Sequence, residues 1–240
     1  METTVTTLRW AIIYLIHRPD VQERLFKEIE TKIGARKVTW ADRTTMHYTM
    51  AVINEVQRII NILPWHIPHA TIADTILRGY NIAKGTTIMP QMGAAIHYNS
   101  ELFPDGEKFD PERFLSEDGT FRTYEQFNPF GFGKRSCLGE GLARMELFII
   151  LSTLMQNFKF SPAYGVLPSL DRSPGMASVP KEYFCQGNAA PTAPRGTLET
   201  LRGQNEHRNG PNRPSQGIDG PNHHRKDDSD MKSWKHTDVL

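Results

Sequence analysis

Apolar residues recur at three- and four-residue steps in four stretches of the chain, and this pattern predicts four helices. The stretches cover residues 4–16, 21–33, 46–62 and 138–158, with a break between the first two at 17–20. The second stretch carries many Glu, Lys and Arg residues beside its apolar stripe, so we expect an amphipathic and mostly solvated helix there. The first and last stretches are predicted to bury an apolar face.

Between the third and fourth predicted helices, short apolar runs alternate with turn residues. Residues 64–89 include Gly79 and the pair Lys84-Gly85, which indicates short strands and a hairpin. Residues 91–98 are compatible with a short helix, and 99–128 form a polar meander. Residues 158–160 and 176–184 are predicted to pair as a final hairpin. The expected fold class is therefore mainly α with a small β part (α+β).

The composition changes near the end of the chain. From residue 187 onward Asn, Gly, Pro, Arg, His and Asp predominate and no apolar periodicity remains. We therefore predict one folded part over residues 1–185 and a disordered tail over 186–240. The tail contains several histidines, but they lack the cysteines and the spacing of a zinc site, so we expect no metal binding there.

Charge and composition exclude several classes of function. The chain has 240 residues, 38% of them hydrophobic, enough for one sizeable core or two small ones. The 28 Lys and Arg residues nearly balance 27 Asp and Glu, so no nucleic-acid partner is expected. The two cysteines suit a reducing compartment. We see neither a signal peptide nor an apolar run long enough for a membrane anchor, so any membrane association is expected to come from outside this sequence.

The clearest chemical signal lies just before the fourth predicted helix. Cys137 follows a glycine-containing loop and precedes a helix start, where free backbone N–H groups favour an ionised sulfur. Lys134 and Arg135 add positive charge. We therefore expect the loop to present a thiolate to a metal. An isolated cysteine in an intracellular chain is more often a free, buried structural thiol, which is the alternative interpretation.

The residues around this cysteine follow the spacing Phe130-x-x-Gly133-x-Arg135-x-Cys137-x-Gly139. This spacing resembles the haem-binding loop of the cytochrome P450 monooxygenases. By this resemblance Cys137 is the axial ligand of the iron of haem b, and Arg135 contacts a haem propionate. Phe130, Gly133 and Gly139 would complete the cofactor-binding loop, with Gly133 permitting a tight bend and Gly139 a close approach of the macrocycle.

The resemblance extends over residues 1–185 and is strongest to the microsomal branch that metabolises drugs and fatty acids. It implies the C-terminal half of the P450 fold. Glu55, Arg58 and Arg113 occur in the order of the family's Glu-Arg-Arg triad, which implies a structural role. From spacing alone, Glu55 and Arg58 predict a surface ion pair worth a few tenths of a kcal/mol. The apolar residues around them favour burial, which requires a further partner such as Arg113.

Other site residues follow only from the resemblance. Glu2 and Thr3 fall where the family's distal helix has the acid and the threonine that deliver protons to bound oxygen. A fraying helix start with a capping hydroxyl explains both equally well. His69 is similar to a basic residue that contacts a haem propionate, although a surface or core histidine is the alternative. Residues 62–67 would form part of the substrate pocket and 175–179 a substrate-contacting turn.

The resemblance implies a haem-thiolate monooxygenase of the endoplasmic reticulum. Such enzymes insert one oxygen atom from O2 into apolar substrates such as xenobiotics, fatty acids or steroids, with electrons from an NADPH-dependent flavin reductase. They are the standard example of a thiolate ligand that favours O–O cleavage.

The sequence is only about half the family's usual length and begins within the distal helix. We therefore expect exposed apolar helix faces, weak haem binding and no turnover by this polypeptide alone, and without an anchor a cytoplasmic or mislocalised protein. Two alternatives to a catalyst follow. One is a truncated, inactive splice form that regulates full-length relatives or their reductase by binding to them. The other is a partial gene model without activity.

Overall fold

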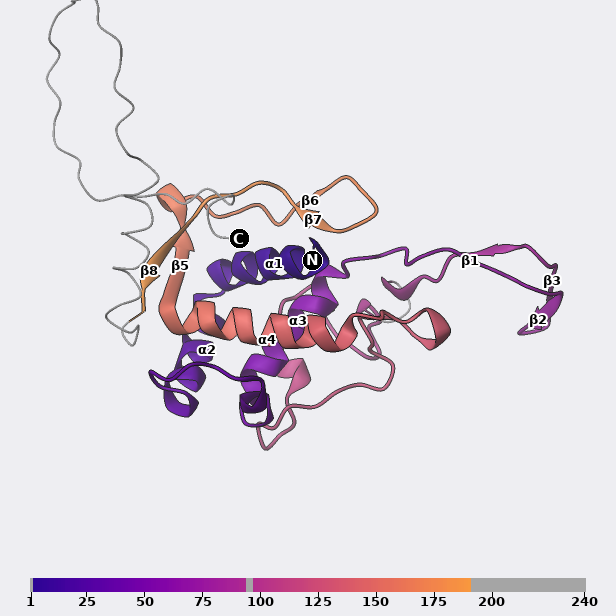
Figure 1. The fold of residues 1–240 in the computed structure, drawn as a ribbon. Helices are drawn as coiled ribbons and strands as arrows, with labels where there is room; N and C mark the ends of the chain where they lie inside the picture. The colour runs from indigo at the N-terminus through magenta and orange to yellow at the C-terminus, as the bar shows by residue number, and fades with distance from the viewer. Residues whose placement is uncertain (1, 94–96, 191–240) are drawn as a thin grey trace, which may run out of the picture.

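The computed structural model describes residues 2–93 and 97–190. Four long helices form its centre, and they coincide with the four periodic stretches of the sequence (Figure 1). They are α1 (Glu2–His17), α2 (Pro19–Lys32), α3 (His47–Ile60) and α4 (Glu140–Asn157). Three short 3-10 helices lie between them in the described residues, η1 (Trp40–Thr44), η3 (Pro111–Phe114) and η4 (Gly133–Arg135), and a further one, η5 (Ala163–Gly165), follows α4 and β5. The predicted mainly α class with a small β part is confirmed.

Local chemistry sets the ends of these helices. Pro19 begins α2 at a position where its missing N–H costs no hydrogen bond. Asn61 ends α3 in the left-handed conformation, with φ of 39°, which a short polar side chain tolerates better than most. Gly139 immediately precedes α4, so the helix begins three residues after Cys137.

The strands form four separate antiparallel pairs, β1 with β4, β2 with β3, β5 with β8 and β6 with β7. Their bounds are β1 His69–Ala70, β2 Thr75–Leu77, β3 Tyr80–Ile82, β4 Thr87–Ile88, β5 Phe158–Pro162, β6 Arg172–Ser173, β7 Val179–Pro180 and β8 Cys185–Ala189. The hairpin predicted within 64–89 is present as β2 and β3.

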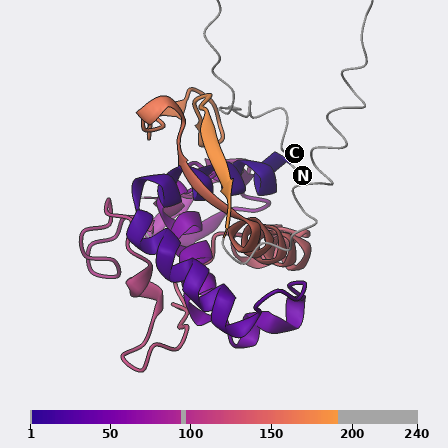
Figure 2. The same cartoon turned by 90° about the vertical axis from the view of Figure 1, so that its left-hand side faces the viewer.

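The final hairpin differs from the prediction. β5 pairs with β8, whereas residues 179–180 pair with β6, so 158–160 and 176–184 are not partners. The sequence of β8, Cys-Gln-Gly-Asn-Ala, has no apolar alternation, because the strand lies at an edge with its last residues exposed. β5 and β8 lie side by side (Figure 2). Their pairing extends to Ala189, beyond the boundary predicted at residue 185.

Two predicted segments are described only in part. The short helix expected over 91–98 includes residues 94–96, which lie outside the described residues. On either side of them, the N–H of Tyr98 donates to the carbonyl of Gly93 at 3.0 Å. The tail expected over 186–240 lies outside the described residues from 191 onward, so that part stays a prediction.

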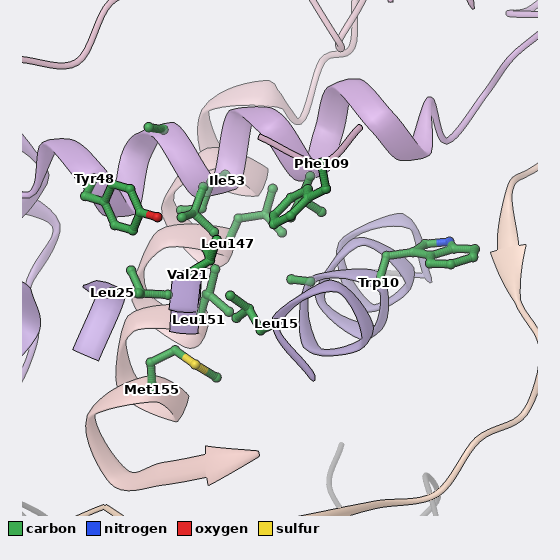
Figure 3. Close-up of a cluster of buried hydrophobic side chains, with 14 of the residues drawn as sticks. Trp10, Leu15, Val21, Leu25, Tyr48, Ile53, Phe109, Leu147, Leu151 and Met155 are labelled. Carbon is green, nitrogen blue, oxygen red and sulfur yellow. The ribbon is translucent and has the colours of Figure 1, made fainter. Parts of the chain in front are cut away.

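The core lies where the four long helices meet (Figure 3). α1 contributes Trp10 and Leu15, α2 contributes Leu25, and α4 contributes Leu151. Each of these side chains is almost fully buried, and burial of one such side chain stabilises a fold by about 1.5–3 kcal/mol. α2 buries one stripe only, as its amphipathic pattern predicts. The core fixes α1, α3 and α4, whose ends carry the site described below.

Strands β1 to β4 form an arm that extends away from the helices (Figure 1). Ile72, Ile76 and Tyr80 of this arm are exposed. Exposed apolar side chains were expected on helix faces instead, but within the described parts of the long helices Leu142 is the only large exposed one. No helix within residues 2–93 and 97–190 has both the length and the apolar character that crossing a bilayer requires.

Candidate functional site

A cavity of about 220 Å³ lies between the start of α1, the end of α3 and the loop that carries Cys137. α1 lines it with three threonines, Thr3, Thr4 and Thr7. The far side is formed by the loop residues Phe130, Arg135 and Cys137 and by Ala143 and Leu147 of α4. Gln57 and Ile60 of α3 and Asn61, which follows this helix, also line it. The walls therefore come from three helices that the core holds together.

Backbone hydrogen bonds give the cysteine loop its shape. The N–H of Cys137 donates to the carbonyl of Phe130 at 2.9 Å, and the N–H of Ser136 donates to the carbonyl of Gly133 at 3.1 Å. Gly133 has φ of 70°, a conformation that favours glycine, so the tight bend expected there is present. The loop thus returns the chain to Phe130 and leaves Cys137 exposed at the cavity.

The loop also requires a glycine at position 131, and the sequence pattern did not predict this requirement. Gly131 has φ of 83°, and a Cβ there would lie 2.8 Å from Cε1 of His66. We expect Gly131→Ala to lower the free energy of unfolding by about 1–3 kcal/mol, because it adds backbone strain and displaces the imidazole. Urea denaturation measures this change.

Gly141→Ala is the matched control, since Gly141 lies in α4 with an ordinary φ and open space around its Cβ position. Alanine in a helix should leave stability unchanged or raise it by up to about 1 kcal/mol. Equal effects of the two substitutions would show that the contact between Gly131 and His66 is not required.

The donor chemistry of the site fits a haem better than a bare metal ion. The described residues contain no group of three or more His, Cys, Asp and Glu side chains that could hold a metal. A bare ion would therefore find one sulfur ligand, whereas a haem brings its own four nitrogens and needs only an axial donor. A Cβ at Gly139 would meet no atom within 4 Å except Sγ of Cys137, at 3.9 Å, so that side of the sulfur is open.

The predicted site residues are only partly brought together. Cys137, Arg135 and Thr3 line the cavity. Glu2 is exposed and does not line it, so the two residues predicted to deliver protons are not side by side at the cavity. His69 lies in β1 and does not line it either. The roles of all these residues stay predictions.

Two histidines that sequence reasoning did not single out do line the cavity, His66 and His97. Burial lowers the pKa of His66, and the charge of His69 lowers it further. His66 falls within the segment 62–67 predicted as pocket wall, which was the available signal. Thr4 and Thr7 were also missed, although Thr7 lies one helical turn from Thr3 and donates its hydroxyl to the Thr3 carbonyl at 2.9 Å.

Beneath the cavity, Glu55 and Arg58 form a fully buried ion pair. Nε of Arg58 donates to Oε2 of Glu55 at 2.7 Å, and Nη2 donates to Oε1 at 2.8 Å. Arg58 Nη1 also donates to the carbonyls of His97 and Gly106, each at 2.7 Å. Oε1 of Glu55 accepts the N–H of Asp110 at 2.8 Å. These bonds fix α3 to the segment 97–110.

Arg113 interacts with this pair through its charge and makes no hydrogen bond to Glu55. Its Nε lies 3.6 Å from Oε1 of Glu55 and has no hydrogen-bond partner. Its other nitrogens donate to the carbonyls of Pro104 and Asp105. Burial raises the pKa of the Glu55 carboxyl, and Arg58 is the main influence in the opposite direction.

His97 links this ion pair to the cavity. Its ring is 3% exposed, and its Nδ1 lies 3.0 Å from the carbonyl of Arg58, so Nδ1 carries the proton. The ring also packs edge-on against Phe127 at 5.2 Å between centroids. Burial lowers the pKa of His97 to about 4, so the ring is neutral at pH 7.

Comparison with known proteins agrees with the fold and the loop. A family model described as Cytochrome P450 matches residues 1–186, and the chain belongs to this family. The family expected from the cysteine loop is confirmed.

Individual relatives cover a similar part of the chain. Cytochrome P450 2E1 of Oryctolagus cuniculus is 46% identical over 162 residues, which are 67% of this chain and 33% of the relative. Cytochrome P450 2H1 of Gallus gallus is 45% identical over 75% of this chain and 37% of the relative. A protein named 3-ketosteroid oxygenase in Caenorhabditis elegans is 43% identical over 76% of this chain and 32% of the relative. The chain thus spans about a third of the length of the relatives it matches.

Proposed function

We propose that this chain binds haem b through the thiolate of Cys137 and contributes to a monooxygenase that acts on apolar organic compounds. The observation that carries the proposal is the position of Cys137, which is exposed at a cavity with no competing cluster of metal ligands in the described residues. Membership of the P450 family and the oxygenase name of one relative support the reaction class.

The residues around the cavity would have different roles in this function. Cys137 would bind the iron, and the cation of Arg135 would pair with a propionate. Ile60 and Leu147 offer apolar walls, which suit xenobiotics, fatty acids or steroids. The Thr3 hydroxyl would hold a proton near the reacting oxygen. When bound, haem supplies the activation of O2 and the insertion of one oxygen atom into the substrate.

Partner and compartment follow from the same proposal. The chain would receive electrons from an NADPH-dependent flavin reductase, as the family resemblance implies, and would work at the endoplasmic reticulum. Phe132 and Leu138 are exposed beside Lys134 next to the cysteine, which supports a protein partner on this face.

Haem titration followed by absorption spectroscopy tests the proposal. The protein should bind one haem and, after reduction and addition of CO, show the band of a thiolate-ligated haem. Cys137→Ser should abolish that band and weaken binding by more than about tenfold, because even outer-shell partners of a metal typically contribute 10–100-fold. Cys185→Ser should leave both unchanged, since Cys185 lies in β8 away from the cavity. Equal haem binding by the Cys137→Ser variant would refute the ligand assignment.

A second candidate is a non-catalytic partner that binds the reductase or full-length relatives. The exposed apolar side chains beside Cys137 favour it as well. The two functions separate in a reaction with added reductase, NADPH and an apolar substrate. Product formation would support the monooxygenase, while capture of the reductase by the Cys137→Ala variant without any product would support the binding partner.

A further inference from the structure

The hairpin of β6 and β7 lies over α1 (Figure 1), and one buried serine in it joins two walls of the cavity. The carbonyl of Ser178 accepts Nε1–H of Trp10 in α1 at 2.7 Å. Its N–H donates to the carbonyl of Ile62 at 2.8 Å, and its hydroxyl donates to the carbonyl of Asn61 at 3.1 Å. Ser178 is 4% exposed, so these bonds form away from water.

Arg172 in β6 contacts the same serine, which immediately precedes β7. Its Nη1 donates to the Ser178 hydroxyl at 3.1 Å. Its Nη2 donates to the carbonyl of Ile59 at 3.0 Å and to the hydroxyl of Tyr98 at 2.7 Å. Tyr98 in turn donates to the Ile59 carbonyl at 2.9 Å. The hairpin is thereby attached to the last turn of α3 by several charged and neutral hydrogen bonds.

Ser178 and Arg172 contact residues that lie in the cavity wall or close to it. Asn61 and Ile62 line the cavity, and Trp10 lies one helical turn beyond Thr7, which lines the opposite wall. Ser178 and Arg172 do not line it. Asn61 also has φ of 39°, an uncommon conformation for a residue other than glycine, which persists only where the surroundings hold it.

We propose that Ser178, held by Arg172, is a positioning residue that sets the spacing between α1 and residues 61–62, and thereby the size of apolar ligand that the cavity accepts. This inference rests on the proposed function for the identity of the cavity as a ligand site. The bonds across the hairpin are independent of any cofactor.

The first experiment needs no haem. Hydrogen–deuterium exchange of the full chain should show faster exchange in Ser178→Ala at residues 60–63 and 172–180, by about three- to tenfold, the range that corresponds to one or two net hydrogen bonds. α2 should exchange as in the unsubstituted protein. Ser152→Ala is the matched control, because Ser152 is a fully buried serine of α4 whose hydroxyl has no partner. It should leave exchange at 60–63 unchanged.

The second experiment measures ligand size preference. Titration calorimetry with a series from ethylbenzene to hexylbenzene, on haem-free and haem-loaded protein, should show that Ser178→Ala shifts the ratio of affinities toward the longer ligand by about three- to tenfold. The thiolate–haem band should stay unchanged, as a loss of that band would indicate general unfolding.

Each outcome has a separate meaning. Unchanged exchange at 60–63, or the same ligand preference in Ser178→Ala and Ser152→Ala, would overturn the positioning role. Failure of the unsubstituted protein to form a thiolate–haem would refute the proposed function, while the exchange result and the haem-free titration would still decide whether Ser178 sets the cavity wall.

Discussion

Replacing Arg58 with alanine should lower the free energy of unfolding by about 3–5 kcal/mol, enough to unfold much of the chain at 37 °C. The guanidinium is fully buried and donates to Glu55 and to the carbonyls of His97 and Gly106. Its removal leaves the Glu55 carboxylate without its closest cation and these carbonyls without donors. Circular dichroism during urea denaturation measures the change.

Two comparisons show whether burial is the cause. Lys159→Ala breaks an ion pair with Glu23 in which both side chains are about half exposed or more, and this should cost at most about 1 kcal/mol. Arg58→Ala combined with Glu55→Ala should be less damaging than the sum of the two single substitutions, since neither charge is then left unpaired. Additive effects would contradict a coupled buried pair.

Acid should destabilise the protein through His97. Its pKa is about 4 in the fold against a usual 6.5, so between these values the unfolded chain binds a proton that the folded chain does not. Stability is therefore complete above about pH 6.5 and is lost as the pH falls toward 4, by about 3 kcal/mol in total. Burial is the main cause, and the nearby charge of Arg58 acts in the same direction.

The His97→Gln variant isolates this contribution. Glutamine keeps a donor for the carbonyl of Arg58 but has no proton to gain, so the variant should lose less stability between pH 6.5 and pH 4 than the unsubstituted protein. Urea denaturation across this pH range measures the difference between the two curves. Parallel curves would show that His97 is already protonated in the fold or equally accessible in both states.

Sequence periodicity predicted the four long helices because each buries one face in a shared core, and burial is what periodicity records. The cysteine loop was also predicted, from the spacing of its residues. Gly133 has a positive φ that favours glycine, and Cys137 lines the cavity, so the loop spacing indicated both positions correctly, while the ligand role of Cys137 stays a proposal. From their spacing alone, Glu55 and Arg58 predicted only a surface ion pair; the apolar residues around them indicated the burial that the structure shows.

Other features leave no such pattern. β8 pairs through backbone groups and its side chains follow no alternation, so the sequence did not indicate this strand and the partner of residues 158–160 was predicted incorrectly. His66 and His69 are close in sequence, and only the three-dimensional structure shows which of them lines the cavity. Ser178 is an ordinary serine in the sequence, and its partners Asn61 and Trp10 lie 117 and 168 residues away.

The hydrogen bonds of Arg58 also constrain how the chain folds during synthesis. Its acceptors outside α3 are carbonyls 39 to 50 residues further along the chain. Gln22 similarly depends on Phe160, 138 residues later. These contacts of α2 and α3 therefore form only after the residues up to 160 have been synthesised, which makes the nascent protein a candidate for chaperone binding.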